Sequence, residues 1–381
     1  VLCSLCLCLA SFAASSQHSL CTPLLVWLLA SLTSKREMNP VLVWLSLAAA
    51  VVADEALLKS VPTVDLSAPT EESVATMQSA LKQWGFFYVK NHGVSASLVQ
   101  EQFGAAQAVF ALPTQDKRNL TFEPTLDIGW LASQGLDEDS GKLDTKEGFM
   151  LSTNGLFEKN ASLDREDPLK GSRLKWPPVK GYEATMRRWT KELYALNLKL
   201  NDILFDAVGL QSAERGRLAS RPFVIVKQLR YAPTLDQLGA GAHADWGSLT
   251  VLVTDDVPGL EIETEEGWLP VPPRPDCFIV NAGDQVDFWT RGFFKSANHR
   301  VRPSEPGKPR YSTALFAYFD YEALVTPLEE IQGEDLSKRA TKEPVTTGDY
   351  FALKLCESIG KPPEDCRVPS GLSTMHDASE L

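Results

Sequence analysis

Hydrophobic and polar residues follow two different rhythms along this chain. In the first half, apolar positions recur at helical spacing, so residues 71–84 and 96–110 each predict a helix, with a strand at residues 86–89 between them. The longest apolar stripe predicts a helix of about seven turns. Its members recur in steps of four and three residues: Tyr182, Met186, Trp189, Leu193, Leu196, Leu200 and Ile203. Such a stripe is typical of a helix packed on a sheet.

The second half of the chain changes to short runs rich in β-branched and aromatic residues. These runs lie at residues 223–229, 249–254, 260–264, 278–280, 285–289, 299–302 and 313–318. Short strands separated by turn residues predict a sandwich or a jelly-roll barrel. We therefore expect an α+β, mainly β protein in which an N-terminal helical part leans on a barrel.

The two rhythms divide the chain into successive parts. Residues 61–178 combine a helix, a strand and a helix with a loop-rich stretch, and residues 179–210 hold the long packing helix. Residues 221–325 form the β-rich core. Residues 326–381 form a C-terminal tail, in which a helix near residues 349–359 could close over the mouth of the barrel.

Residues 1–55 are set apart by two apolar stretches and are excluded from the predicted fold. The second stretch follows Met38 and ends in small residues before Asp54, the pattern of a signal-peptide cleavage site. It is shorter than the ~20 residues of a membrane span, so no stable span is expected in the mature protein. If residues 38–53 are a signal peptide, the protein enters the secretory pathway. If the leader is artefactual, a cytoplasmic location is expected.

The charge and the cysteine content of the chain limit the classes of partner that we expect. The net charge of −12 is spread along the chain, and no Lys/Arg run interleaves with aromatic residues, so nucleic acid is not expected as a partner. Cys356 and Cys366 flank a Pro-containing turn and could form a disulfide in an oxidising compartment. We expect a monomer whose partner is a small-molecule substrate.

Candidate metal ligands occur at His243 and Asp245. In an extended strand, residues i and i+2 project from the same face, so these two side chains could bind one metal ion. His299 begins another predicted strand and is the natural third ligand. Two imidazoles and a carboxylate form the facial triad of iron(II) oxygenases. A hydrolytic zinc site can use the same three side chains, so the triad alone leaves the metal open.

A second pair with the same spacing is Arg310 and Ser312. The guanidinium matches a carboxylate and the hydroxyl adds a donor, so the pair could anchor one end of a dicarboxylic acid whose other end chelates the metal. Tyr231 could supply a further hydroxyl. By residue type alone, a surface position is the commoner place for Arg310.

Five segments taken together resemble a known family. They are WGFFYVKNHGV at 84–94, HADWGSLT at 243–250, NAGDQ at 281–285, HRV at 299–301 and RYS at 310–312. In this order, over about residues 61–321, they resemble the isopenicillin N synthase-like branch of the iron(II)- and 2-oxoglutarate-dependent dioxygenases. The resemblance implies a double-stranded β-helix (jelly-roll) core and structural roles for His92 and Asp284. It also implies iron ligands at His243, Asp245 and His299, and 2-oxoglutarate held by Tyr231, Arg310 and Ser312.

The same resemblance implies an enzyme that uses Fe(II), 2-oxoglutarate and O2, with ascorbate as an optional addition. It would hydroxylate or desaturate a small organic molecule and release succinate and CO2. Two alternatives stay open: a same-fold iron oxidase that does not use 2-oxoglutarate, of the isopenicillin N synthase or aminocyclopropanecarboxylate oxidase type, and a non-catalytic ligand-binding or scaffold member. No motif encodes the substrate, although Phe149 is a candidate wall of its pocket.

Overall fold

The computed structural model describes most of the chain from Ser60 to Ser358. The described residues are 60–68, 70–121, 129–132, 136–137, 142–143, 146–152, 169, 175–233, 238–302, 307–340 and 342–358. The predicted leader, residues 1–55, and Cys366 lie outside these ranges. From Val61 onward the described residues belong to one compact unit. None of the helices in these ranges combines the length and the apolar character that a bilayer crossing requires.

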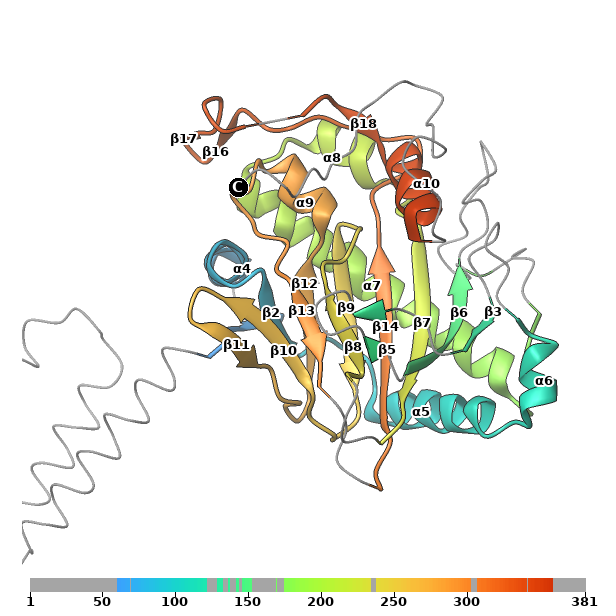
Figure 1. Cartoon of the computed structure of the whole chain (residues 1–381). Coiled ribbons are helices and arrows are strands. Elements are labelled where there is room, and N and C mark those ends of the chain that lie inside the picture. The colour runs from blue at the N-terminus through green and yellow to red at the C-terminus, as the bar shows by residue number, and fades with distance from the viewer. Residues whose placement is uncertain are drawn as a thin grey trace, which may run out of the picture. The chain divides into compact units, whose positions relative to one another are not determined.

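Two sheets form the core, with the smaller in front of the larger in Figure 1. The larger sheet has the order β1 (Thr63–Asp65), β2 (Phe86–Lys90), β12 (Cys277–Ala282), β9 (Leu249–Thr254), β14 (Arg310–Ala317), β7 (Val224–Tyr231), β6 (Lys146–Ser152) and β3 (Gly129–Leu131). The smaller has the order β11 (Gly267–Pro270), β10 (Leu260–Thr264), β13 (His299–Val301) and β8 (Ala240–His243). Only the β1–β2 pair in these two sheets is parallel. The predicted jelly-roll, mainly β class is confirmed.

Alternation along β7 separates the two faces of the larger sheet. Val226 belongs to the main core, and Gln228 donates a hydrogen bond to the Gln102 carbonyl of the helical layer. Leu229 and Tyr231 lie on the other face and pack with Val301 of the smaller sheet. We call this second face, which looks toward the smaller sheet, the inner face.

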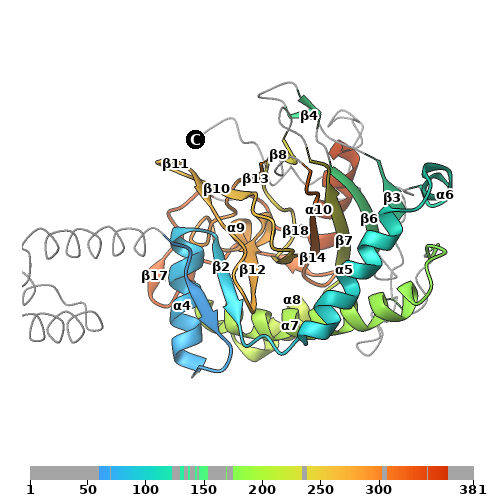
Figure 2. The same ribbon diagram turned by 90° about the horizontal axis from the view of Figure 1, so that it is seen from below.

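Helices cover the opposite, outer face, as Figure 2 shows for α4, α7 and α5. The N-terminal and central helices are α4 (Thr70–Gln83), α5 (Ala96–Phe110), α6 (Thr114–Arg118), α7 (Tyr182–Val208) and α8 (Ser212–Ala219). The long predicted helix is α7, and six of the seven residues of its stripe are buried, whereas Ile203 is half-buried. Gly209 ends it with φ of 74°, a left-handed conformation that glycine adopts without a steric cost.

One predicted strand is a helix. Residues 285–289 were expected to be extended because Val, Phe and Trp favour strands, but they belong to α9 (Asp284–Trp289). The buried residues Val286 and Trp289 are three apart, which is a helical spacing, and the Thr290 N–H donates to the Val286 carbonyl. The prediction of a strand at residues 285–289 is therefore wrong.

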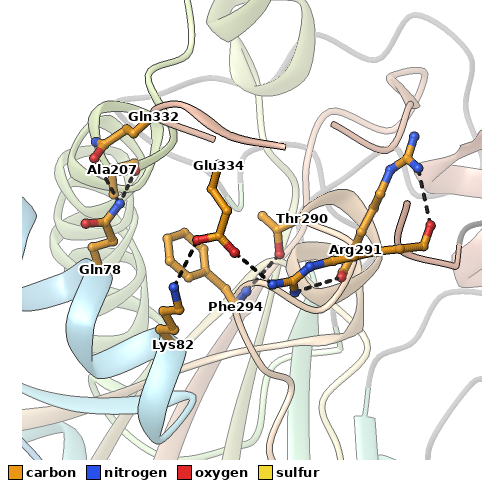
Figure 3. Close-up of polar contacts among 9 residues, drawn as sticks. Gln78, Lys82, Ala207, Thr290, Arg291, Phe294, Gln332 and Glu334 are labelled. Atoms are coloured by element: carbon orange, nitrogen blue, oxygen red, sulfur yellow. Dashed lines mark hydrogen bonds and ion pairs between the residues drawn. The ribbon is translucent and has the colours of Figure 1, made fainter. Parts of the chain in front are cut away.

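The C-terminal part crosses the helical layer before it forms the last helix. We call residues 326–340 the C-terminal strap; it contains the hairpin β16 (Glu330–Ile331) and β17 (Glu334–Asp335). Two short strands, β15 (Leu324–Val325) and β18 (Val345–Thr346), pair on either side of it. The strap is tied to α4 and α7 by polar contacts (Figure 3).

The predicted C-terminal helix is α10 (Thr347–Ser358). Its Phe351 packs edge-on against Phe223 and Tyr318, in a cluster that includes Ile225 of the inner face, so the helix closes one end of the barrel. Cys356 on α10 is disulfide-bonded. Because Cys366 lies outside the described residues, the pairing of these two cysteines stays a prediction.

Candidate metal and co-substrate site

The three predicted metal ligands lie together at the inner face. His243 ends β8, His299 begins β13, and the two are opposite each other in the antiparallel pairing. One ligand atom from each of His243, Asp245 and His299 lies within 4.8 Å of the other two. The His299 Nε2 is 3.8 Å from the Asp245 Oδ1. In the described part of the chain, this is the one group of three potential ligand residues that is so close.

Asp245 reaches the site by a different route from the predicted one. The sequence suggested that one extended strand presents both His243 and Asp245, but β8 ends at His243 and Asp245 lies in the following turn. The Asp284 N–H holds this turn by donating to the Asp245 carbonyl at 2.7 Å. A Cβ at Gly283 would collide with the backbone oxygens of Gly247 and Asp245, so this close approach requires glycine.

Backbone carbonyls orient both imidazoles. The Nδ1 of His243 lies 2.9 Å from the Gly241 oxygen, and the Nδ1 of His299 lies 3.2 Å from the Ala297 oxygen. Because a carbonyl oxygen can only accept, each Nδ1 carries a proton, and each Nε2 keeps its lone pair for a metal.

Two neighbouring side chains orient the carboxylate. The Oδ2 of Asp245 accepts hydrogen bonds from the Thr250 hydroxyl at 2.6 Å and from the Asn281 amide at 2.8 Å. Its Oδ1 faces His299. Sequence reasoning gave no role to Thr250 or Asn281, although each is a polar residue within a mostly apolar strand, a signal that could have identified them.

The electrostatics favour a metal-binding protonation state. Burial raises the pKa of Asp245, but the charges of His299 and His243 and the two hydrogen bonds outweigh it and hold the pKa below its ordinary value. His243 is exposed by its surface area, yet the protein around its ring desolvates it, and His299 and Lys146 add positive charge, so the pKa of His243 is lowered. A neutral imidazole beside an ionised carboxylate suits a divalent cation.

Arg310 and Ser312 lie on the inner face of β14, and both are only 1% exposed. The Arg310 guanidinium stacks over the Tyr231 ring at 4.9 Å, and its Nε donates to the Val257 carbonyl at 3.2 Å. Neither the Arg310 Nη1 nor the Ser312 hydroxyl has a hydrogen-bond partner among the described residues. A surface position for Arg310 is thus excluded, and its unpaired donors fit the carboxylate of an organic acid.

His92 and Asp284 have the structural contacts that were expected of them. The His92 ring stacks on Phe278 with 3.7 Å between centroids, and its Nδ1 accepts a hydrogen bond from the Val94 N–H. Asp284 accepts hydrogen bonds from the Ser296 hydroxyl and, at 2.9 Å, from the Tyr350 hydroxyl of α10. The carboxylate of Asp284 therefore connects α10 to the loop that leads to His299.

Phe149 was expected to form a pocket wall, and this prediction is wrong. Its ring is buried on the outer face of β6, edge-on to Tyr182 of α7. The residues on either side of it, Gly148 and Met150, lie on the inner face, because they are paired with Leu229 and Lys227.

Comparisons with known proteins cover most of the described chain. A family model described as non-haem dioxygenase in morphine synthesis N-terminal matches residues 61–178, and a model of the 2OG-Fe(II) oxygenase superfamily matches residues 222–318. The 2-oxoglutarate-dependent dioxygenase citB of Monascus ruber is 33% identical over 304 residues, which cover 71% of this chain and 88% of that protein.

Solved structures show the same fold. A Neurospora crassa protein, solved at full length in complex with alpha-KG and thymine, superposes with a TM-score of 0.66 at 22% identity, covering 78% of this chain and 97% of that one. JOX2, solved with 2OG, Fe and JA, has a TM-score of 0.66 at 24% identity and covers 82% of this chain and 89% of its own.

Proposed function

This chain belongs to the 2-oxoglutarate- and iron(II)-dependent oxygenase superfamily, and we propose that His243, Asp245 and His299 hold its iron ion. The protein is a dioxygenase that uses iron(II), 2-oxoglutarate and O2 to act on a small organic molecule. The observation that carries the iron assignment is the approach of three ligand atoms to within 4.8 Å of one another, each with its orienting hydrogen bonds.

Arg310, Ser312 and Tyr231 bind 2-oxoglutarate in this proposal. A buried donor without a partner costs about 1–3 kcal/mol, and a charged one costs more, so Arg310 Nη1 and the Ser312 hydroxyl favour a ligand that satisfies both. A carboxylate does so, because the guanidinium offers a fork and the hydroxyl a further donor. The Tyr231 ring beneath the guanidinium limits its orientation.

The bound iron and 2-oxoglutarate, together with O2, supply the oxidising power to attack a C–H bond, with release of succinate and CO2. The protein's own residues position these groups. Thr250 and Asn281 fix the Asp245 carboxylate, and the Gly241 and Ala297 carbonyls fix the two imidazoles. Low pKa values at Asp245 and His243 keep both ready to bind the metal at neutral pH.

Hydroxylation or desaturation of the substrate, by a monomer, completes the proposal. All six candidate iron and co-substrate residues come from one chain, which is consistent with a site that needs no second subunit. The apolar side chains of α10 and the inner face exclude water from one end of the barrel.

The test is an anaerobic titration of the protein with iron(II) and then 2-oxoglutarate, which should produce a weak visible charge-transfer band. The band should form in the wild type and weaken strongly in Arg310→Ala. Arg230→Ala is the matched control, because Arg230 lies on the adjacent strand but faces outward and pairs with Glu147. Iron binding without a band would favour the oxidase that dispenses with 2-oxoglutarate. Failure to bind iron would overturn the assignment of the three ligands.

A further inference from the structure

The proposed iron ligands Asp245 and His299 come from two separate segments, and the first turn of α9 contacts both. The Asp284 N–H donates to the Asp245 carbonyl at 2.7 Å. The next N–H, of Gln285, donates to the Gly247 carbonyl at 3.1 Å. Both acceptors belong to the turn that carries the carboxylate ligand, so the backbone of α9 fixes the position of this turn.

The side chains of the same helix hold the segment that carries His299. The Asp284 Oδ1 accepts a hydrogen bond from the Ser296 hydroxyl at 2.9 Å. The Asp287 Oδ2 accepts one from the Ser296 N–H at 3.0 Å. Ser296 precedes Ala297, whose carbonyl oxygen orients the His299 imidazole. Two carboxylates of α9 therefore fix the residue next to the one that orients this ligand.

The loop between α9 and Ser296 is short and is supported from several sides. At its start, the Phe294 N–H donates to the Thr290 hydroxyl at 3.1 Å (Figure 3). Further hydrogen bonds attach Lys295 to α4 and Asn298 to β10. These contacts reach elements other than the turn of the carboxylate ligand, so they hold the loop without joining the two iron ligands to each other.

The side chain of Asp284 has little freedom to move. It is buried, with 5% of the residue exposed, and its Oδ2 accepts a hydrogen bond from the Tyr350 hydroxyl of α10 at 2.9 Å. One carboxylate oxygen therefore contacts the loop before His299, and the other contacts α10. A side chain held at both oxygens, on a backbone held at its N–H, makes a rigid connection between the Asp245 turn and Ser296.

We propose that Asp284 is a positioning residue that sets the distance between the iron ligands Asp245 and His299. Its N–H determines where the Asp245 turn lies, and its carboxylate determines where Ser296 and the Ala297 carbonyl lie. Metal sites tolerate changes of only about 0.2 Å in ligand distances, so a shift of either segment weakens iron binding. This inference rests on the proposed function, because it concerns the same iron ligands. It goes beyond the structural role of Asp284, which predicts an effect on stability alone.

The experiment compares two variants that each remove one hydroxyl donor from the Asp284 carboxylate. Ser296→Ala removes the donor in the loop before His299, whereas Tyr350→Phe removes the donor on α10. Both should lower the midpoint of chemical denaturation of the metal-free protein. Replacement of Asp284 itself would remove both contacts and a buried charge together, so the hydroxyls are removed one at a time.

Anaerobic titration with iron(II) alone measures the affinity of the folded protein for the metal. We expect Ser296→Ala to weaken this affinity about tenfold, the lower end of the range for partners of metal ligands, because Ser296 acts through Ala297. Tyr350→Phe should stay within about twofold of the wild type, because the Ser296 hydroxyl still holds the loop. Ser296→Thr retains the hydroxyl and should restore most of the affinity. When 2-oxoglutarate is added, Ser296→Ala should also shift the position of the charge-transfer band, which a loss of stability alone does not do.

The outcomes separate this inference from the proposed function. If the wild type does not bind iron(II), the proposed function fails and this inference fails with it. If Ser296→Ala binds iron(II) as well as the wild type does, the positioning role is overturned while the iron assignment stands. An equal loss in Ser296→Ala and Tyr350→Phe overturns it too, because the effect then follows the stability of the fold and not the position of the loop. A loss confined to Ser296→Ala and reversed in Ser296→Thr supports the positioning role.

Discussion

The C-terminal strap and the inner face of the barrel both gather charged and amide side chains, but their polar groups differ in what satisfies them. In the strap, Glu334 accepts hydrogen bonds from Lys82 of α4 and from Arg339, and Gln332 accepts one from Gln78 (Figure 3). The Lys82 and Glu334 side chains are 52% and 41% exposed. The strap thus satisfies these groups within the protein and still leaves them in contact with water.

On the inner face the situation is reversed. Arg310 and Ser312 are 1% exposed, and each has a polar atom without a partner among the described residues. An exposed ion pair contributes about 0–1 kcal/mol, whereas a buried unpaired donor costs about 1–3 kcal/mol. The strap contacts therefore serve the fold weakly, and the inner-face groups reduce stability until a ligand binds.

An unpaired buried group does not by itself mark a site. Asn197 and Asn201 of α7 also have buried amides without partners among the described residues, and they lie in the helical layer, away from any group of metal ligands. What distinguishes Arg310 and Ser312 is their place on the inner face, which also carries the metal triad. The comparison teaches that unpaired polar atoms indicate function where they converge with a second chemical feature.

The largest effect is expected from Ser312→Ala. Its hydroxyl has no partner among the described residues, so its removal should not lower the free energy of unfolding of the metal-free protein. The affinity for 2-oxoglutarate should fall about 10- to 100-fold, as expected for a lost hydrogen bond to a charged group. Titration of the charge-transfer band measures the affinity, and chemical denaturation measures the stability.

Ser248→Ala is the matched control for that variant. Ser248 is equally buried, but its hydroxyl donates to the Ala317 carbonyl at 3.2 Å. Its loss should lower the free energy of unfolding by about 1 kcal/mol and leave 2-oxoglutarate binding intact. If the two serine variants behaved alike, the distinction between paired and unpaired groups would fail.

The sequence was most informative where neighbouring residues decide the structure. The helix at 96–110 and the close approach of His243, Asp245 and His299 were predicted correctly, because helical periodicity and the spacing of ligand residues are visible along the chain. Arg310 and Ser312 were selected by the same i and i+2 spacing on one strand. Their roles toward 2-oxoglutarate stay a proposal.

The features that the sequence did not reveal depend on contacts between segments that are far apart along the chain. In β6, Phe149 and Leu151 are apolar, but so is Met150 between them. The strand therefore shows no alternation of apolar and polar residues that would distinguish its outer face from its inner face, and only the pairing with β7 identifies the two faces. The hydrogen bonds of Thr250 and Asn281 to Asp245 likewise join separate strands. The turn that places Asp245 depends on α9, which the short apolar run at 285–289 did not predict.

A smaller effect is expected from Tyr350→Phe. The Tyr350 hydroxyl donates to the buried carboxylate of Asp284, and burial first, then the charge of Asp284, raises the pKa of Tyr350, so it stays a donor at neutral pH. The variant should lower the free energy of unfolding by about 1–2 kcal/mol, because a buried carboxylate loses one of its partners. The charge-transfer band should persist, since Tyr350 is not among the residues proposed to bind iron or 2-oxoglutarate.

Tyr88→Phe provides the comparison for Tyr350. The Tyr88 hydroxyl donates to the neutral carbonyl of Pro272 at 2.6 Å, so its loss should cost less, about 0.5–1 kcal/mol. Thermal unfolding of both variants measures the difference. An equal loss in the two would mean that the charge of Asp284 adds nothing to the connection between α10 and the loop before His299.

The smallest effect is expected from Glu334→Gln in the strap. Its pairs with Lys82 and Arg339 are exposed, so the free energy of unfolding should fall by less than about 1 kcal/mol at low salt, and the difference should vanish as salt screens the charges.

Glu147→Gln is the contrast, because Glu147 is 12% exposed and is held by Lys117, Trp130 and Arg230. Its loss should be larger and should persist at high salt, since partly buried charges are screened less. Neither variant touches the inner-face donors, so neither should change the titration with iron(II) and 2-oxoglutarate. A change in that titration for Glu334→Gln would show that the strap is coupled to the site and that the two regions are not independent.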